Sequence, residues 1–228
     1  MIRVVAFDLD DTLWAVDPVI IRAEQRLREW LALELPDVDY SRDTLGNLRR
    51  EVLVRHPEVV HRVTDFRLRL LETAMIRSGI PEKQAVDLAQ QAMEVFLVAR
   101  NDIEFFEGAL DAIKRLASRY QLGALTNGNA DIHRLGLADH FSFAFSAEQV
   151  GAPKPAPDLF HRALQHTGVD PHEMVYVGDD PEKDVDAANR VGLRTIWVRN
   201  AARPGPGETS PDHTIEHIRE LPGVLERL

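Results

Sequence analysis

The distribution of helical and strand patterns divides this chain before any single residue is considered. Residues 18–101 contain helical patterns alone, with apolar side chains at helical spacing and no strand signal. One short apolar run, residues 3–9, precedes this stretch and is typical of a buried parallel strand. Helices and strands alternate only from about residue 107 onward. We therefore expect an α/β core that is interrupted, after its first strand, by an inserted all-helical segment.

The segments after residue 107 predict the layout of this core. Expected strands are 122–127, 143–146, 174–180 and 194–199, and expected helices are 108–119, 155–168 and 182–192. A Pro/Gly-rich loop at 201–211 precedes a last short strand and helix within 213–221. Strands that alternate with helices favour a doubly wound parallel sheet. Ligands bind such sheets outside the carboxyl ends of the strands, so we expect the functional site there.

Composition narrows the classes of function. The 228-residue chain has a formal net charge of -10, which argues against sequence-independent nucleic-acid binding, because such binding needs clustered Lys and Arg. It has no cysteine, which excludes disulfides, thiolate catalysis and zinc–cysteine sites. No stretch is long and apolar enough to cross a bilayer, and the N-terminal residues lack a signal-peptide layout. We expect a cytoplasmic enzyme without nucleic-acid or membrane partners; the sequence leaves its oligomeric state open.

Polar side chains follow three of the expected strands. These strand ends carry Asp8 and Asp10, then Thr126 and Asn127, then Asp179 and Asp180, with Asp184 one helical turn further on. Lys154 stands between two prolines in the loop between the second and third of them. The carboxyl ends of parallel strands share one rim of a sheet, so these side chains are expected to meet. Asp8 and Asp10 are expected on the same side of the chain, because strand side chains alternate with a period of two.

Such a group of carboxylates favours a metal site. Like charges beside a buried sheet repel one another, and a divalent cation relieves the repulsion. Mg²⁺ suits a few carboxylates together with waters and substrate phosphate. A plainer interpretation of each motif alone stays open: Asp10, Asp11 and Thr12 form a turn with a helix cap, and Lys154 is a solvated loop lysine. Asp11 itself is expected to be structural.

In this order the motifs resemble those of the haloacid dehalogenase superfamily of phosphohydrolases. The matching segments are FDLDDTL at 7–13, LTNGN at 125–129, Lys154, and GDDPEKD at 178–184. The resemblance implies a Rossmann-like core with a helical cap inserted between the first and second motifs. The implied division assigns residues 1–13 and 102–228 to the core and residues 14–101 to the cap.

Roles for individual residues follow from the same resemblance. Asp8 would be the nucleophile that forms an aspartyl-phosphate, and Asp10 would be the general acid and base. Thr126, Asn127 and Lys154 would hold the phosphate. Asp8, the backbone carbonyl of Asp10, and Asp179 would bind Mg²⁺. Asp180 and Asp184 would act from behind these ligands, by orienting Lys154 or a metal-bound water.

A narrower resemblance, to bacterial flavin mononucleotide phosphatases also assigned to 5-amino-6-(5-phosphoribitylamino)uracil, rests on segments beyond the motifs. These segments are PVIIRAE at 18–24, VHRVTDFRLR at 60–69, LTNGNA at 125–130 and VGDDPEKDVDAANRVG at 177–192. It implies substrate contacts from the third insert helix, for which His61, Thr64 and Arg67 are the candidates. Phosphatases of other sugar phosphates, nucleotides or acylneuraminate phosphates stay open, as do a phosphomutase and an idle binding protein on the same scaffold. Asp10 argues against dehalogenation, because haloacid dehalogenases proper lack that acid.

Overall fold

The computed structural model describes residues 1–200 and 205–228 and divides the chain into two compact units. The first unit is Met1–Val16 with Ile103–Leu228, and the second is Asp17–Asp102. These bounds differ by a few residues from the predicted division, since Trp14 to Val16 fall in the first unit. Of the predicted loop 201–211, residues 201–204 lie outside the described part of the chain. No helix in the described residues is long and apolar enough for a membrane span.

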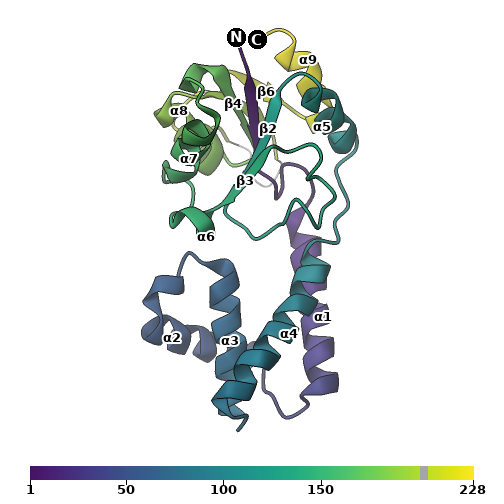
Figure 1. Cartoon of the computed structure of the whole chain (residues 1–228), viewed down its shortest axis with the longest axis vertical. Coiled ribbons are helices and arrows are strands. Elements are labelled where there is room, and N and C mark those ends of the chain that lie inside the picture. The colour runs from purple at the N-terminus through teal and green to yellow at the C-terminus, as the bar shows by residue number, and fades with distance from the viewer. Residues whose placement is uncertain (201–204) are drawn as a thin grey trace. The chain divides into compact units, whose positions relative to one another are not determined.

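A six-stranded parallel sheet forms the centre of the first unit, as predicted (Figure 1). The strands are β1 Val4–Phe7, β2 Gln121–Thr126, β3 Phe143–Ser146, β4 Met174–Gly178, β5 Arg194–Val198 and β6 His213–Ile215. Their order is β3-β2-β1-β4-β5-β6, so the N-terminal strand lies in the middle. Its two neighbours β2 and β4 are the strands whose ends carry the other polar motifs, which brings all three ends together.

Helices cover both faces of this sheet, which confirms the doubly wound α/β prediction. Figure 1 shows α7 and α8 on one side and α5 and α9 on the other. Their bounds are α5 Ala109–Ala117, α6 Ala147–Val150, α7 Asp158–Thr167, α8 Ala187–Val191 and α9 Leu221–Leu225. The buried face of α7, with Phe160 and Ala163, packs into one core with Val4 and Tyr176 of the sheet. Burial of such apolar side chains supplies the main stabilisation of the layers.

The first half of the predicted helix 182–192 is not a regular α-helix in the structure. Residues Pro181–Asp186 form a π-helical turn, and regular α-helix begins only at α8. Asp180 caps the turn, because its Oδ1 accepts hydrogen bonds from the backbone N–H groups of Glu182 and Lys183 at 3.1 and 3.0 Å. Single π turns are frequent at functional sites, and this one carries Asp184.

Four α-helices make up the second unit. They are α1 Val16–Glu34, α2 Arg42–Arg55, α3 Val63–Arg77 and α4 Glu82–Arg100, with a 3₁₀ turn at Pro57–Val59. Ala85, Ala89 and Ala92 form a buried stripe of small side chains along α4, at the spacing of one helix face. Larger apolar residues of the other helices fill the same core, among them Leu27 and Leu71.

The third insert helix begins later than predicted. The sequence analysis placed His61 on the third insert helix, but α3 starts at Val63. Val59 is buried in the core of the unit while Val60 is 57 % exposed. The chain therefore turns between Val59 and Arg62 instead of continuing one helical face. His61 lies in this turn, and Thr64 and Arg67 lie on the helix.

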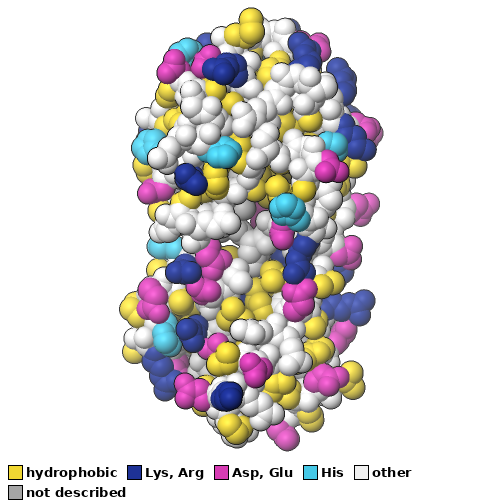
Figure 2. All heavy atoms as spheres, in the orientation of Figure 1, with side chains coloured by type: hydrophobic (Ala, Val, Ile, Leu, Met, Phe, Trp, Pro, Cys, Tyr) yellow, Lys and Arg dark blue, Asp and Glu magenta, His cyan; other side chains and the backbone are white. Residues whose placement is uncertain are grey.

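Acidic and basic side chains are interspersed on the face of the molecule that Figure 2 shows. Many form ion pairs one helical turn apart in the second unit, such as Arg55 with Glu51 and Arg69 with Glu72. Exposed pairs of this kind contribute about 0.3–0.5 kcal/mol each.

Candidate active site

The carboxyl ends of β1, β2 and β4 form a small pocket within the first unit. Its lining residues are Asp8, Asp10, Asp11, Val16, Thr126, Asn127, Gly128, Lys154, Asp179, Asp180, Lys183 and Asp184. The sheet ladder extends one residue past β1, because the Asp8 N–H donates to the Val177 carbonyl of β4 at 2.8 Å. This hydrogen bond fixes the start of the first motif against the strand that leads to Asp179. Every residue that the four motifs assigned to the core site lines this one pocket.

Lys154 lies at the floor of the pocket, with its residue only 3 % exposed. Its Nζ donates to Asp8 Oδ1 at 2.8 Å, to Asp184 Oδ1 at 2.7 Å and to the Tyr176 hydroxyl at 2.6 Å. An ammonium has three donors, so each has a partner here. Lys154 is therefore a fixed internal cation and not a solvated loop lysine.

Tyr176 is a site residue that the sequence analysis missed. It lies on β4, and its hydroxyl donates to the Leu125 carbonyl of β2 at 3.0 Å while accepting from Lys154. Burial raises its pKa well above the ordinary tyrosine value, with Lys154 opposing, so the hydroxyl keeps its proton. The available signal was one polar-tipped aromatic in an otherwise aliphatic buried strand, because a buried tyrosine hydroxyl usually finds a hydrogen-bond partner.

Burial and neighbouring charges together shift the pKa values of Asp8 and Lys154. Burial raises the pKa of Asp8 well above its usual value; Lys154 lowers it, and Asp184 and Asp179 raise it further. For Lys154, burial lowers the pKa, but Asp184 and Asp8 outweigh burial and the pKa lies above the usual lysine value. The lysine is thus a stable cation, whereas the negative charge of Asp8 is opposed by its surroundings.

Three buried carboxylates could hold a metal ion. Asp8, Asp179 and Asp184 each place one oxygen within 4.8 Å of the others. Against these three negative charges Lys154 supplies one positive charge, which leaves an excess that a divalent cation would neutralise. The residues therefore fit a hard divalent cation with oxygen ligands.

Asp184 differs from the other two carboxylates in what it already binds. Its Oδ1 accepts from Lys154, and its Oδ2 accepts from the Asp180 N–H at 2.9 Å. A side chain on Gly178 would exclude this arrangement, since a Cβ there would lie 2.3 Å from Asp184 Oδ2. Both Asp184 oxygens thus contact the lysine and the loop, and its role in orienting Lys154 or a metal-bound water stays a prediction.

Asp179 is oriented by donors from three parts of the chain. Thr12 Oγ1 donates to its Oδ1 at 3.4 Å, and Asn200 Nδ2 donates to its Oδ2 at 3.2 Å. The indole N–H of Trp197 donates to its backbone carbonyl at 2.9 Å. Asn200, two residues after the end of β5, is a second residue that the motifs did not indicate. These contacts leave Asp179 one arrangement in which to meet a cation.

The loop after β1 holds Asp10 beside Asp8. Asp10 Oδ1 accepts from the indole N–H of Trp14 at 3.0 Å, so Trp14 positions an acid as well as packing in the core. Asp11 adopts the left-handed conformation, with φ of 60°, and its Oδ1 accepts from the Val16 N–H at 2.9 Å. An aspartate tolerates this conformation better than most residues, in keeping with the structural role expected for Asp11.

Thr126 and Asn127 are arranged differently from each other. Thr126 is buried at the end of β2, and its Oγ1 accepts from the Gly128 N–H at 2.9 Å. Both ends of the Asn127 amide bind the Lys154 backbone, the oxygen from N–H at 2.8 Å and the nitrogen to the carbonyl at 2.9 Å. Asn127 was predicted to bind phosphate; in this structure its side chain holds Lys154 in place.

The candidates from the insert lie in the second unit. Arg67 pairs with Glu24, and its guanidinium lies 3.7 Å from the centre of the Phe96 ring. These contacts give Arg67 a packing role inside its own unit. Substrate contacts by His61, Thr64 and Arg67 stay a prediction.

Comparison with known proteins identifies the family of this chain. Residues 2–192 match the model of the haloacid dehalogenase-like hydrolase family. The chain belongs to this family, which confirms the resemblance drawn from the four motifs.

Individual relatives carry several activities in their names. The 5-amino-6-(5-phospho-D-ribitylamino)uracil phosphatase YigB of Escherichia coli is 36 % identical over 87 % of this chain and 84 % of its own length. A phosphoserine phosphatase of Thermus thermophilus is 36 % identical over 68 % of this chain and 64 % of its own. A solved structure described as 2-haloacid dehalogenase from Pseudomonas syringae is 39 % identical, with a TM-score of 0.94 over 100 % of this chain and 99 % of that one. The phosphatases among them support the predicted class, a phosphoric monoester hydrolase.

Proposed function

We propose that this protein is a Mg²⁺-dependent phosphatase that hydrolyses a small phosphate monoester through an aspartyl-phosphate on Asp8. The observation that carries the proposal is the buried ammonium of Lys154 between Asp8 and Asp184, beside Asp179. This arrangement provides a carboxylate nucleophile, a fixed positive charge for phosphate oxygens and a place for a divalent cation in one pocket.

The reaction divides into two steps. In the first, an Asp8 oxygen forms a bond to phosphorus, the bond from phosphorus to the ester oxygen breaks, and Asp10 gives its proton to that oxygen. In the second, a water oxygen attacks the phosphorus of the aspartyl-phosphate, Asp10 takes a proton from the water, and the Asp8 carboxylate leaves. The Thr126 hydroxyl would hold a phosphate oxygen in both steps, and the positive charge of Lys154 would attract the phosphoryl group. Asp10 lies in the same pocket as Asp8, and Trp14 orients it.

Magnesium is the cation that fits the donors best. Asp8, Asp179 and the Asp10 carbonyl would hold it, and carboxylates with a carbonyl are the hard oxygen ligands that Mg²⁺ prefers. Bound there, the ion supplies positive charge against the carboxylates and the transferring phosphoryl group.

The substrate proposed is flavin mononucleotide or a phosphorylated intermediate of riboflavin synthesis. The similarity to a 5-amino-6-(5-phospho-D-ribitylamino)uracil phosphatase over 87 % of the chain supports this class. The pocket at Asp8 has a volume of about 180 Å³, below the roughly 300–1,000 Å³ of typical small-molecule pockets. It suits a phosphoryl group, so the remainder of the ester must be recognised outside it.

A turnover panel tests the proposal. Phosphate release is measured from flavin mononucleotide, phosphoserine, a nucleotide, a sugar phosphate and acetyl phosphate, with Mg²⁺ and with EDTA, and halide release from 2-chloropropionate. We expect Mg²⁺-dependent phosphate release, highest for the flavin ester, and no halide release. Halide release without phosphatase activity would assign dehalogenation instead, and equal rates in EDTA would remove the role of the metal.

A further inference from the structure

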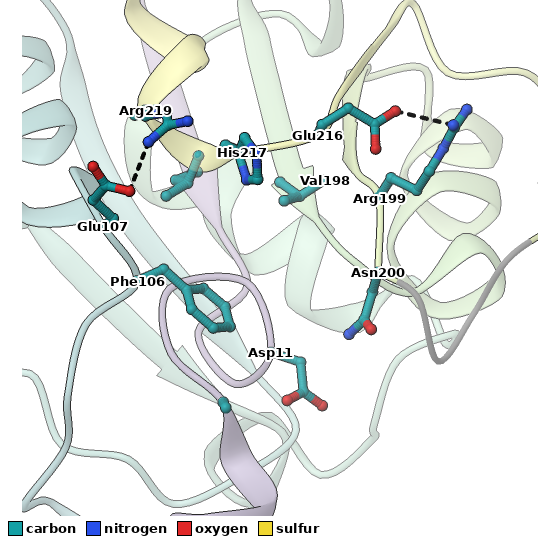
Figure 3. Close-up of a pocket in the computed structure, with 11 residues that line it drawn as sticks. Asp11, Phe106, Glu107, Val198, Arg199, Asn200, Glu216, His217 and Arg219 are labelled. Carbon is teal, nitrogen blue, oxygen red and sulfur yellow. Dashed lines mark hydrogen bonds and ion pairs between the residues drawn. The ribbon is translucent and has the colours of Figure 1, made fainter.

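A second and larger cavity lies within the first unit, beside the catalytic pocket. It has a volume of about 440 Å³, within the range of small-molecule sites. Its lining includes Asp11, Phe106, Val198, Asn200 and His217. Figure 3 shows these side chains arranged around the cavity, with Asp11 and Asn200 at one end. Asp11 also lines the pocket that contains Asp8, so the two spaces adjoin.

Both walls of this cavity are attached to catalytic segments. On one side, the Phe106 N–H donates to the Leu13 carbonyl at 2.8 Å, and Phe105 forms a bridge and an edge-to-face ring contact with Trp14. On the other side, Asn200 donates to Asp179. A ligand in the cavity would thus be held at a fixed position relative to the Asp8 loop and the metal site.

The chemistry of the lining selects an uncharged, partly apolar ligand. The two arginines of the lining are paired: Arg199 with Glu216 at 2.9 Å and Arg219 with Glu107 at 2.7 Å, as the dashed lines in Figure 3 show. Asp11 adds a negative charge, so a second phosphate would find no excess of positive charge here.

An aromatic surface faces this cavity. Phe106 is 40 % exposed although it is large and apolar, whereas Val198 and Ile218, which also line the cavity, are buried. A planar ring gains apolar contact and offset stacking on an exposed phenylalanine. Asn200, His217 and Asp11 make the lining partly polar, and each side chain also forms a hydrogen bond within the protein.

We propose that this cavity binds the uncharged, planar heteroaromatic ring of the substrate's alcohol portion while the phosphate lies at Asp8. The proposal rests on the phosphatase function proposed above and narrows it to esters in which a flexible chain joins a ring to the phosphate. The flavin and uracil esters have this form, whereas phosphoserine does not. The core of the enzyme would then contribute to recognition of the ring, in addition to the contacts predicted for the insert.

Riboflavin is the probe, because it carries the ring without the phosphate and its fluorescence reports stacking. We expect the wild-type protein to quench riboflavin fluorescence in a saturable way. The dissociation constant should be about tenfold larger for Phe106→Leu and close to the wild-type value for Phe106→Tyr. Phe145→Leu is the matched control: the same change in the same unit, on a ring that stacks with Phe143 away from the cavity. It should bind riboflavin as the wild type does, and thermal melting confirms that each variant is folded.

Kinetics separate this proposal from the proposed function. Phe106→Leu should lower kcat/KM for flavin mononucleotide by a larger factor than for acetyl phosphate, which has no ring. If the wild-type protein does not hydrolyse acetyl phosphate, the phosphatase proposal is overturned, and riboflavin binding stands as a separate result. Equal riboflavin affinity in the wild type and Phe106→Leu, or a best substrate without a planar ring, would overturn the ring site.

Discussion

Asp8 carries its negative charge in a place where burial opposes that charge. Its contact with Lys154 compensates only in part, because Asp184 competes for the same ammonium and Asp179 adds repulsion. A side chain placed in this way is suited to attack phosphorus once a cation balances the negative charge. Without a cation, its charge lowers the free energy of unfolding of the protein. Function and stability are thus in conflict at this residue.

Asp8→Asn is expected to abolish turnover and leave the fold intact. The amide keeps the shape of the side chain but supplies neither the attacking oxygen nor a charged metal ligand. Phosphate release should fall to background while circular dichroism stays near that of the wild type. Substantial Mg²⁺-dependent activity in this variant would contradict the assignment of the nucleophile.

The same variant has a predictable effect on stability. In the folded protein the pKa of Asp8 is raised. Protonated Asp8 therefore stabilises the folded protein at pH values below the ordinary aspartate pKa of about 3.9. This stabilisation is lost as pH rises through the pKa of the folded state. Asp8→Asn has no such group to titrate, so it does not lose this stabilisation. In EDTA, the melting temperature of the variant minus that of the wild type should therefore increase with pH. Melting curves from about pH 4 to about pH 8 measure the difference, and a gap that narrows with pH would contradict the assigned direction.

Asp10→Asn should slow esters with poor leaving groups most. An alkyl phosphate needs a proton on its departing oxygen, whereas p-nitrophenyl phosphate needs little help. The ratio of the two rates in variant and wild type is the measurement, with a burst experiment to detect slow breakdown of the aspartyl-phosphate. Equal losses for both esters, with no burst, would show that Asp10 is not the leaving-group acid.

The strands determine how the site residues come together, and the end of β5 contributes groups that orient Asp179. Through the Trp197 indole and the Asn200 amide, β5 and the residues after it hold both the carbonyl and a carboxylate oxygen of Asp179. Groups that orient metal ligands from behind typically affect metal affinity by about 10–100-fold. The β5 end is thus part of the proposed metal site, although it would contribute no ligand.

Asn200→Ala should weaken Mg²⁺ binding by about tenfold while the protein stays folded. Titration calorimetry, or the rise in melting temperature with added Mg²⁺, reports the affinity without relying on catalysis. Asn47→Ala, the same change at an exposed position of α2, is the control and should bind Mg²⁺ as the wild type does. Unchanged affinity in Asn200→Ala would mean that Thr12 and the backbone suffice to orient Asp179.

The elements also show where sequence analysis succeeds and where it ends. Buried strands and their polar ends were predictable because hydrophobic pattern and motif order are local signals. Tyr176 and Asn200 were not, because their roles depend on partners 51 and 21 residues away that only the folded sheet brings near. The π turn at Pro181–Asp186 and the late start of α3 were missed for other reasons. Asp180 caps the π turn locally, and Val59 packs into the core of the second unit ahead of α3.

For the whole molecule, the prediction is that the insert at 14–101 selects among substrates while the core performs the chemistry. Every residue assigned a catalytic role lies in the first unit, and the phosphate would be held there whatever ester it belongs to. The insert and the cavity at Phe106 are therefore separate candidates for recognising the rest of the ester.

Separate alanine substitutions at His61, Thr64 and Arg67 test the insert. Any residue that contacts substrate should change kcat/KM for flavin mononucleotide far more than for acetyl phosphate, by about 1–3 kcal/mol for a hydrogen bond to a charged group. Arg67→Ala also removes contacts with Glu24 and Phe96, so its melting temperature must be measured alongside. If all three variants slow both substrates alike, or neither, recognition does not come from these positions.

The bridge between Trp14 and Phe105 has a consequence for how such enzymes diversify. These residues flank the points where the chain leaves the first unit and returns to it, and the bridge brings them side by side within that unit. The two ends of the insertion point are thus held together within the first unit, whatever segment is inserted between Val16 and Ile103. Because closing a longer loop adds little entropic penalty, evolution or an engineer can exchange that stretch as a cassette and leave the catalytic sheet unchanged.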